Sequence, residues 1–485
     1  MMDTFFFHGR VWQGKGRFAQ AILVRRGRIA LVGETEALRP HAQGCAFIDC
    51  GGRAVIPGIQ DGGLFLAAAW PRAFPPCGTA EELARAGSLW LDGHPRAGEK
   101  GFYSCIRWGA EPPPRAWLDA LCPAAPAVVE DVGHGWALAN TAACDLLEGR
   151  GIPPRLEPGI WRDGAGKLTG RFYGPACRLA AAAMPLPSQR ERRTLLEEAL
   201  RRTAAQGVTA VRSLDLDVTL PREVLPVLSE LCRGLEGLPR LRMTSRPAAE
   251  GSLPCRRLGL PEQGPGPLRS GVFLSENGPG GAILDSGEHI ARLWNETAAR
   301  GLPLTVWTGE GSGPDVRTCW ERTGQRPGNR LRCALAGCRS LAPETLHWAG
   351  EQGMGALFFP SRWDDRPGED RWQLRTLSAL GAHTAVGGLD ECAPFAHLAR
   401  LCRRRDPETG EISREALSRE TALECLTAGA AWMDFQEDFL GRLAPGYGAD
   451  LLVLDRDVFS CPEEELADIR PLLVMTAGAL ALREI

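Results

Sequence analysis

The second half of the chain alternates strand-like and helix-like segments, and this alternation constrains the fold more than any other feature. Between residues 188 and 404, apolar runs such as Val208–Val211 and Leu302–Thr308 alternate with amphipathic stretches such as Asp285–Arg300. This order predicts a parallel sheet, because each helix carries the chain back to the start of the next strand. The length of the pattern predicts an α/β fold, a (β/α)8 TIM-type barrel in preference to an open doubly wound sheet.

Both ends of the chain have the character of β-structure. Residues 21–32 and 47–56 form short β-rich runs separated by turns, and residues 449–455 and 471–478 repeat this pattern with no crossover-length helix between them. We therefore expect one composite β-sandwich domain from residues 1–57 plus 435–485. Residues 58–434 are expected to form the barrel domain, with an insertion after the first barrel strand at about 71–190, where proline and glycine are frequent but tryptophans supply apolar bulk.

Composition excludes several classes of function. The 485 residues carry a net charge of -3 with 44% hydrophobic residues, so there is no basic excess to attract nucleic acid or a membrane surface. No apolar run is long enough to cross a bilayer, and the N-terminus lacks the features of a secretory signal, so a cytoplasmic protein is expected. Sixteen cysteines without a C-x-x-C pair indicate buried thiols in preference to a zinc or disulfide framework.

Three stretches resemble a known family. Residues 441–457, beginning Gly441-Arg442-Leu443 and continuing through Ala449-Asp450, are similar to the Gly-x-Leu-x-Pro-Gly-x-x-Ala-Asp signature of the amidohydrolase superfamily. Residues 57–61, Pro-Gly-Ile-Gln-Asp, resemble the segment where these enzymes enter their barrel, and residues 465–470 are similar to the amidohydrolase family 3 branch. The resemblance implies a barrel with a composite β domain, metal-dependent hydrolysis of carbon–nitrogen bonds and a homodimer.

This chain departs from the family at the metal-ligand motifs. The resemblance implies a His-x-His pair after the first barrel strand and further donor side chains on later strands. The corresponding positions hold Gly63, Phe65, Phe273, Trp307, Leu335 and Leu389. Among them only Trp307 has a polar group, and its indole N–H only donates. Because zinc, nickel and iron need N, O or S donors, we expect a divergent member without a metal cofactor.

The replacement residues allow two interpretations. Large apolar residues inside a small barrel are more often core packing than a ligand pocket. The alternative is an apolar pocket for a small molecule at the barrel mouth, formed by Phe65, Phe273, Trp307, Leu335 and Leu389. The resemblance adds His134 and Asn140 to this pocket, because they match the His…Asn-Ser-x-Ala element of the branch apart from a one-residue offset.

Acidic residues support a rival hypothesis. Asp61, Glu310, Asp390 and Glu391 are expected near the same barrel mouth, and carboxylates can hold a hard cation or act as a general acid/base pair. The first hypothesis is therefore a pseudoenzyme that binds a small molecule or acts as a scaffold. The second is an active hydrolase of carbon–nitrogen (non-peptide amide) bonds with an altered site built on Asp61, Glu310 or Asp390.

Overall fold

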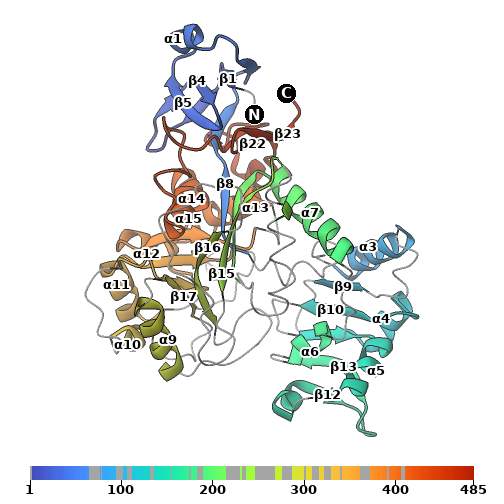
Figure 1. The fold of residues 1–485 in the computed structure, drawn as a ribbon. Coiled ribbons are helices and arrows are strands. Elements are labelled where there is room, and N and C mark those ends of the chain that lie inside the picture. The colour runs from blue at the N-terminus through green and yellow to red at the C-terminus, as the bar shows by residue number, and fades with distance from the viewer. Residues whose placement is uncertain are drawn as a thin grey trace. The chain divides into compact units, whose positions relative to one another are not determined.

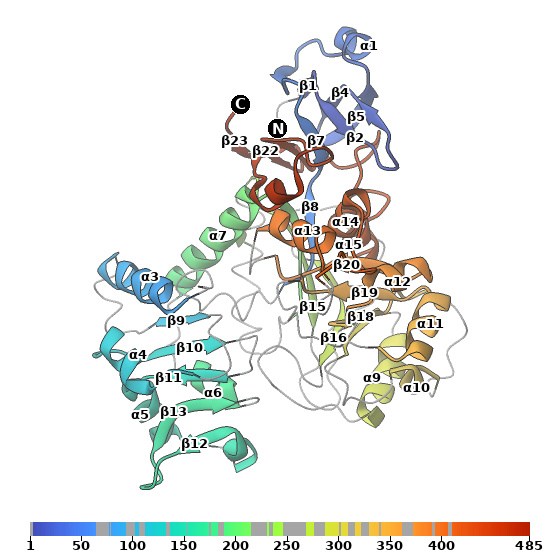
Figure 2. The same ribbon diagram turned by 180° about the vertical axis from the view of Figure 1, so that it is seen from behind.

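A computed structural model describes most of the chain (Figures 1 and 2). The described residues are 3–64, 77, 79–93, 102–105, 112–131, 136–152, 154–173, 176–182, 189–214, 230–231, 236–245, 268–275, 287–299, 302–308, 316–321, 329–338, 341–360, 372–389, 393–405 and 410–485. The chain divides into two compact units. We call residues 1–67, 196–274 and 287–485 the main unit, and residues 68–195 and 275–286 the insertion unit.

An eight-stranded sheet forms the centre of the main unit. Its strands are β8 (Ile59–Leu64), β14 (Val208–Ser213), β15 (Arg240–Ser245), β16 (Leu268–Ser275), β17 (Leu304–Trp307), β18 (Ala334–Ala336), β19 (Gly355–Phe358) and β20 (His383–Val386). The strands follow one another across the sheet in chain order, and the registers of β8 through β16 and of β17 through β20 are parallel. This is the strand order of a TIM-barrel-type α/β fold, as the alternating sequence pattern predicts.

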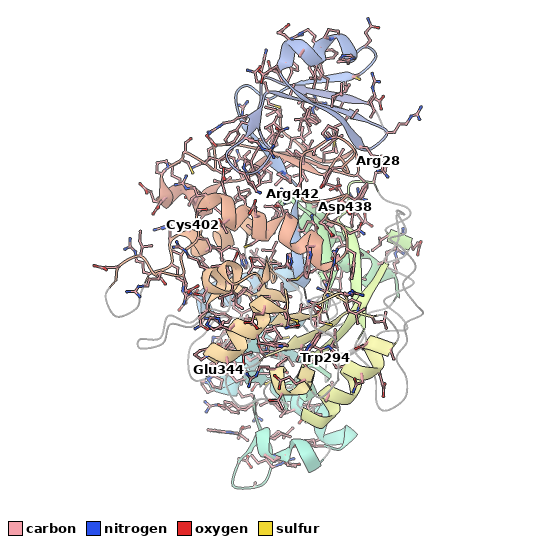
Figure 3. The ribbon with its side chains drawn as sticks, turned by 90° about the vertical axis from the view of Figure 1, so that its left-hand side faces the viewer. Arg28, Trp294, Glu344, Cys402, Asp438 and Arg442 are labelled. Carbon is pink, nitrogen blue, oxygen red and sulfur yellow. The ribbon has the colours of Figure 1, made fainter. Side chains whose placement is uncertain are left out.

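Helices connect these strands. They are α7 (Gln189–Ala205), α9 (Gly287–Ala299), α10 (Val316–Glu321), α11 (Pro343–Glu351), α12 (Leu374–Ala379) and α13 (Pro394–Cys402). The helices α9, α10 and α11 pack through one tryptophan each: the ring of Trp320 lies 4.9 Å from that of Trp294 (Figure 3) and 6.0 Å from that of Trp348. Six consecutive buried residues in β14 agree with a parallel strand that is covered on both faces.

Strands from the two ends of the chain share one sheet. This six-stranded sheet has the order β23 (Ala479–Arg483), β22 (Pro471–Thr476), β21 (Leu451–Leu454), β7 (Ala54–Pro57), β2 (Arg10–Trp12) and β3 (Phe18–Ala19). The C-terminal strand β21 runs antiparallel to the N-terminal strand β7, with Leu452 opposite Ile56. The blue and red strands therefore lie together in Figure 1.

A second sheet packs beside this one. Its order is β5 (Arg28–Gly33), β4 (Ala21–Arg25), β1 (Thr4–Phe7) and β6 (Ala46–Asp49), with the short helix α1 (Thr35–Leu38) following β5. Side chains from both sheets, among them Phe6, Ile22, Val55 and Val453, form one buried cluster. We call the two sheets together the terminal β region.

The insertion unit has its own layered fold. Its five-stranded sheet has the order β12 (Ile160–Arg162), β13 (Leu168–Tyr173), β11 (Trp136–Ala139), β10 (Ala127–Asp131) and β9 (Phe102–Cys105). Val128 packs in one core cluster and Val129 in another, so the two faces of the sheet bury different partners. The helices of this unit are α3 (Ala80–Gly93), α4 (Arg115–Leu121), α5 (Thr141–Arg150) and α6 (Cys177–Ala182).

Two further helices, α14 (Arg419–Leu426) and α15 (Ala428–Met433), follow α13 and pack against β20. The sequence pattern predicts a helical stretch over Ser413–Met433, and the structure has two helices within it, the first of which begins at Arg419. The chain breaks at Thr427, and the contact with β20 is so close that a Cβ atom at Gly429 would lie 2.0 Å from the carbonyl oxygen of Thr384. Within the described residues, no helix has the length and apolar character needed to span a membrane.

Candidate functional site

The carboxyl ends of the barrel strands enclose an apolar cluster. Leu214, Ala336, Leu357, Phe359 and Ala385 are buried there, and Ala430 and Met433 of α15 belong to the same cluster. Trp307 is half-buried and packs on the cluster with its ring 5.0 Å from that of Phe359. The registers Trp307↔Ala336, Ala336↔Leu357 and Leu357↔Ala385 place these residues at one level of the sheet. We call this group the barrel-interior cluster.

Gly63 faces the barrel-interior cluster and has no space for a side chain. A Cβ atom built at this position would lie 2.6 Å from Leu357 Cδ2, 2.8 Å from Leu214 Cδ1 and 3.2 Å from Phe359 Cζ. Real Cβ atoms do not approach other atoms as closely as 2.6 Å, so even alanine requires the neighbours to move. An imidazole at this position would require repacking of the cluster.

Leu335 and Leu389 are both buried but differ in their surroundings. Leu335 alternates with Ala336 along β18 and is in register with Val306 and Ala356, so it points to the face opposite the barrel-interior cluster. It therefore does not line the pocket expected from the sequence. Leu389 follows β20, and its backbone N–H donates a hydrogen bond to Asp61 in the first barrel strand, β8.

Asp61 is the one proposed catalytic carboxylate within the described residues. Its side chain is 2% exposed. The Oδ1 atom accepts a hydrogen bond from Gly63 N at 2.9 Å, and the Oδ2 atom accepts one from Leu389 N at 2.9 Å. Both carboxylate oxygens are therefore bonded to the backbone of the barrel.

The remaining candidates of the barrel mouth cannot be placed in this way. Phe65, His134, Glu310, Asp390 and Glu391 lie outside the described residues. Phe273 belongs to β16, where only the backbone is described. Their roles remain predictions from the sequence.

Asn140 has a structural role in the insertion unit. Its Nδ2 group donates to the carbonyl oxygens of Cys122 (2.8 Å) and Ala125 (2.7 Å), and its Oδ1 atom accepts from Ala127 N (2.9 Å) and Ala143 N (3.0 Å). An asparagine amide has two donor hydrogens and two acceptor lone pairs, so this capacity is filled. Asn140 caps the N-terminus of α5, and no hydrogen-bonding capacity is left for a ligand.

The sequence-based reasoning missed a buried ion pair in the barrel. Arg212 on β14 is 1% exposed; its Nη2 atom donates to Thr305 Oγ1 at 2.9 Å, and its Nε atom lies 3.5 Å from Asp434 Oδ1. Burial lowers the pKa of Arg212, and the charge of Asp434 opposes this shift. The signal in the sequence was a charged residue in a strand that is otherwise uncharged.

Charged and aromatic residues also meet where β18 and β20 begin. The ring of His383 stacks on that of Trp432 at 3.7 Å, and Arg332 pairs with Glu437 while its guanidinium lies 5.0 Å from the Trp432 ring centroid. Burial lowers the pKa of His383, the positive charge of Arg332 lowers it further, and Glu437 opposes the shift.

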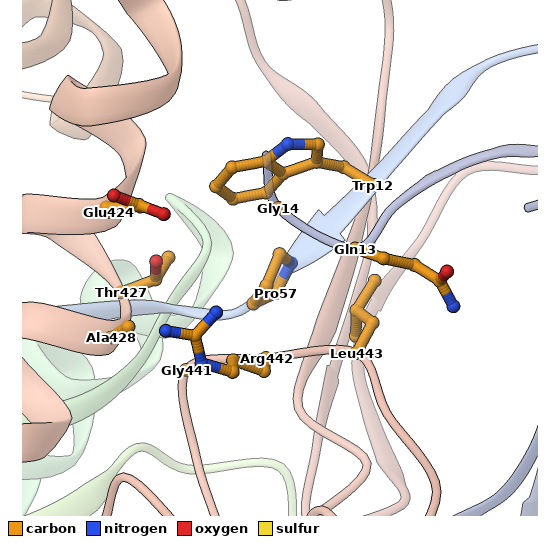
Figure 4. Close-up of a pocket in the computed structure, with 10 residues that line it drawn as sticks. All are labelled: Trp12, Gln13, Gly14, Pro57, Glu424, Thr427, Ala428, Gly441, Arg442 and Leu443. Atoms are coloured by element: carbon orange, nitrogen blue, oxygen red, sulfur yellow. The ribbon is translucent and has the colours of Figure 1, made fainter. Parts of the chain in front are cut away.

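A pocket between the terminal β region and the helices α14 and α15 is lined by Trp12, Pro57, Glu424 and Arg442, among others (Figure 4). It encloses about 10 Å³, roughly the space of one water molecule. The pocket shares no lining residue with the barrel-interior cluster and is too small for an organic substrate. In the part of the chain that the structure describes, no group of three or more His, Cys, Asp or Glu side chains is placed to hold a metal ion.

Curated relatives match part of this chain. An N-substituted formamide deformylase from Arthrobacter pascens is 31% identical over 189 residues, which cover 36% of this chain and 34% of that protein. The protein LONG AFTER FAR-RED 3 from Arabidopsis thaliana is 28% identical over 213 residues, 41% of this chain and 35% of that protein. Each match thus spans only about a third of the relative's length.

Solved structures match nearly the whole chain. An uncharacterized metal-dependent hydrolase from Pyrococcus horikoshii OT3 superposes with a TM-score of 0.73 at 18% identity and covers 95% of this chain and 99% of its own. N-isopropylammelide isopropylaminohydrolase from Burkholderia multivorans gives a TM-score of 0.56 at 16% identity, with coverage of 100% and 99%. At these identities the likeness shows the fold. The sequence model described as "Amidohydrolase family" matches residues 46–481, and the chain therefore belongs to the amidohydrolase family.

Proposed function

We propose that this member of the amidohydrolase family is a pseudoenzyme. It does not hydrolyse carbon–nitrogen bonds with a bound metal, and its barrel acts as a scaffold or binds a small molecule. One observation carries the proposal. Leu214, Leu357 and Phe359 fill the space beside Gly63, where the family resemblance implies a metal-binding histidine. We also propose that the two chain ends form a composite β-sandwich domain, which stabilises the scaffold by joining the N- and C-terminal parts of the chain.

The donor chemistry of the site supports the same conclusion. Among the positions that correspond to metal ligands, Gly63, Leu335 and Leu389 offer no side-chain N, O or S atom, and Trp307 offers only a donor N–H. Zinc and similar ions bind through lone pairs of such atoms, so these residues do not fit a metal.

The second candidate function is a carbon–nitrogen hydrolase with a carboxylate-based site. The partial match to an N-substituted formamide deformylase favours this class, because formamide cleavage breaks a non-peptide C–N bond. Asp61, which lies within the described residues, would then act as the general acid or base of this enzyme. Against this role, both of its carboxylate oxygens already accept backbone N–H groups.

Metal analysis and a substrate panel together test the proposal. Protein purified without chelators from cells supplied with zinc, manganese and iron is measured by inductively coupled plasma mass spectrometry, and N-substituted formamides, other amides and esters are assayed. We expect far less than about one metal ion per chain and no turnover above the blank. Turnover above the blank, together with roughly one ion per chain, would establish the second candidate instead.

A further inference from the structure

The first and last strands of the barrel sheet meet without a strand ladder in the described residues. In the sheet order, β20 and β8 are the two end strands. Two consecutive amides after β20 provide the described hydrogen bonds between them: Gly388 N donates to Gly63 O, and Leu389 N donates to Asp61 Oδ2, both at 2.9 Å. We call this junction the seam. These two hydrogen bonds join the end strands directly at the seam.

Glycines on both sides let the strand ends approach closely. A Cβ atom at Gly387 would lie 2.7 Å from the carbonyl oxygen of Gly63, and one at Gly62 would lie 3.0 Å from the carbonyl oxygen of Val386. Because a Cβ atom would collide with these carbonyl oxygens, the two strand ends can approach this closely only with glycine at both positions. The glycines of the seam therefore allow direct contact between the backbones of the two strand ends.

The carboxylate of Asp61 completes this contact. Its two oxygens bind one amide on each side of the seam, Gly63 N within β8 and Leu389 N after β20. Hydrogen bonds from N–H groups to an ionised carboxylate are stronger than bonds between neutral groups. Removing the acceptor would leave two backbone N–H groups without their partner in a buried place, which is costly.

We propose that Asp61 is the latch of the barrel: its carboxylate holds the last strand against the first, and its loss opens the seam. The role is that of a positioning residue, and it holds whether or not the chain has catalytic activity. The barrel-interior cluster lies directly behind the seam, since Gly63 contacts Leu357 and Phe359, so opening of the seam would expose this cluster to water.

Hydrogen exchange measured by mass spectrometry on the full chain tests the latch. In Asp61→Ala, we expect the amides of residues 59–64 and 383–389 to exchange on the order of tenfold to a hundredfold faster, while residues 451–454 and 471–476 of the terminal β region keep their rates. The matched control is Glu415→Ala. Glu415 is also a buried carboxylate that accepts a backbone N–H, from Thr376 at 3.0 Å, so its loss should affect α12 and leave the seam protected.

Asp61→Asn sharpens the test. The amide side chain keeps one oxygen but presents an NH2 group where the second oxygen was, so one of the two backbone N–H groups faces a donor. We expect faster exchange at the seam in this variant too. Unchanged seam exchange in both variants would overturn the latch, whatever the result for turnover or metal content.

A measurement on the wild-type chain covers the case in which the variants do not fold. The latch predicts that the amides of Gly63 and Leu389 open together and therefore have equal protection factors, resolved by nuclear magnetic resonance or by fragmentation of single peptides. Free exchange at Leu389 beside a protected Gly63 would overturn the proposal. If turnover or metal were found while the seam behaves as expected, only the proposed function would fail.

Discussion

The terminal β region and the barrel-interior cluster show different relations to the family. In the terminal β region the signature residue Asp450 is present and engaged: its Oδ2 atom pairs with Arg240 Nη2 at 2.9 Å, and its Oδ1 atom accepts from Ala477 N at 3.1 Å. Arg240 and Arg28 (Figure 3) both lie over the ring of Phe439. This signature thus connects the first residues of barrel strand β15 to the last strands of the chain.

In the barrel interior, apolar side chains fill the space beside Gly63, a position where the family resemblance implies a metal ligand. Both regions are nevertheless closely packed, and the fold is that of the family. In the proposed pseudoenzyme, the residues that hold this fold together are kept and the residues that perform its chemistry are lost. Four predictions test how closely the barrel interior is packed and how much its residues contribute to the free energy of unfolding.

The largest expected effect concerns the ion pair inside the barrel. Replacing Arg212 by methionine leaves the buried carboxylate of Asp434 without its cation, and breaking such a pair costs about 3–5 kcal/mol. The measurement is urea-induced unfolding followed by circular dichroism. In the exposed pair of Arg201 and Glu197, Arg201→Met should change the unfolding free energy by less than about 1 kcal/mol. Equal effects of the two substitutions would contradict a buried pair.

Truncation of one leucine in each region compares their packing directly. Leu357→Ala in the barrel interior and Leu451→Ala in the terminal β region should each lower the unfolding free energy by about 2–5 kcal/mol, because both side chains are fully buried. Leu89→Ala, at a side chain that is 66% exposed, is the control. If Leu357 lined an open ligand cavity, its truncation would cost much less than that of Leu451.

A side chain at Gly63 tests whether the interior is full. Gly63→Ala should cost about 1–3 kcal/mol by overpacking, and Gly63→His should cost more. Adding Leu357→Ala to Gly63→His should recover part of the loss, because it removes the nearest atom. Gly149→Ala, in a helix with open space around it, should be neutral or slightly stabilising. A neutral Gly63→Ala would show that the interior has free space.

The smallest effect is a pH dependence from His383. Its pKa is lowered in the folded chain, so its contribution is fully present above the pKa of an unfolded histidine, about 6.5, and is lost as the pH falls through the folded pKa. Urea midpoints at a pH above 7 and near pH 5 should therefore differ less in His383→Gln than in the wild type. The same difference in both proteins would contradict the shift.

Several elements could be predicted from the sequence because their signals are local. The amphipathic stretch Asp285–Arg300 contains α9 (Gly287–Ala299), and the strand expected over Leu302–Thr308 contains β17 (Leu304–Trp307). The sheet of the insertion unit could not be predicted, because its short strands are separated by irregular segments and show little periodicity. The role of Asn140 was also missed, although asparagine before a helix is a capping signal.

The sequence by itself determined the family and the order of strands and helices, because these depend on residue identity and on short-range periodicity. It also predicts that the positions matched to metal ligands lack donor side chains. Only the tertiary structure decided what occupies the space those ligands would need. Leu214, Leu357 and Phe359 come together at Gly63 from distant parts of the chain, and Asp61 bonds an amide 328 residues away. Local patterns do not specify such contacts, because the closure of the sheet creates them.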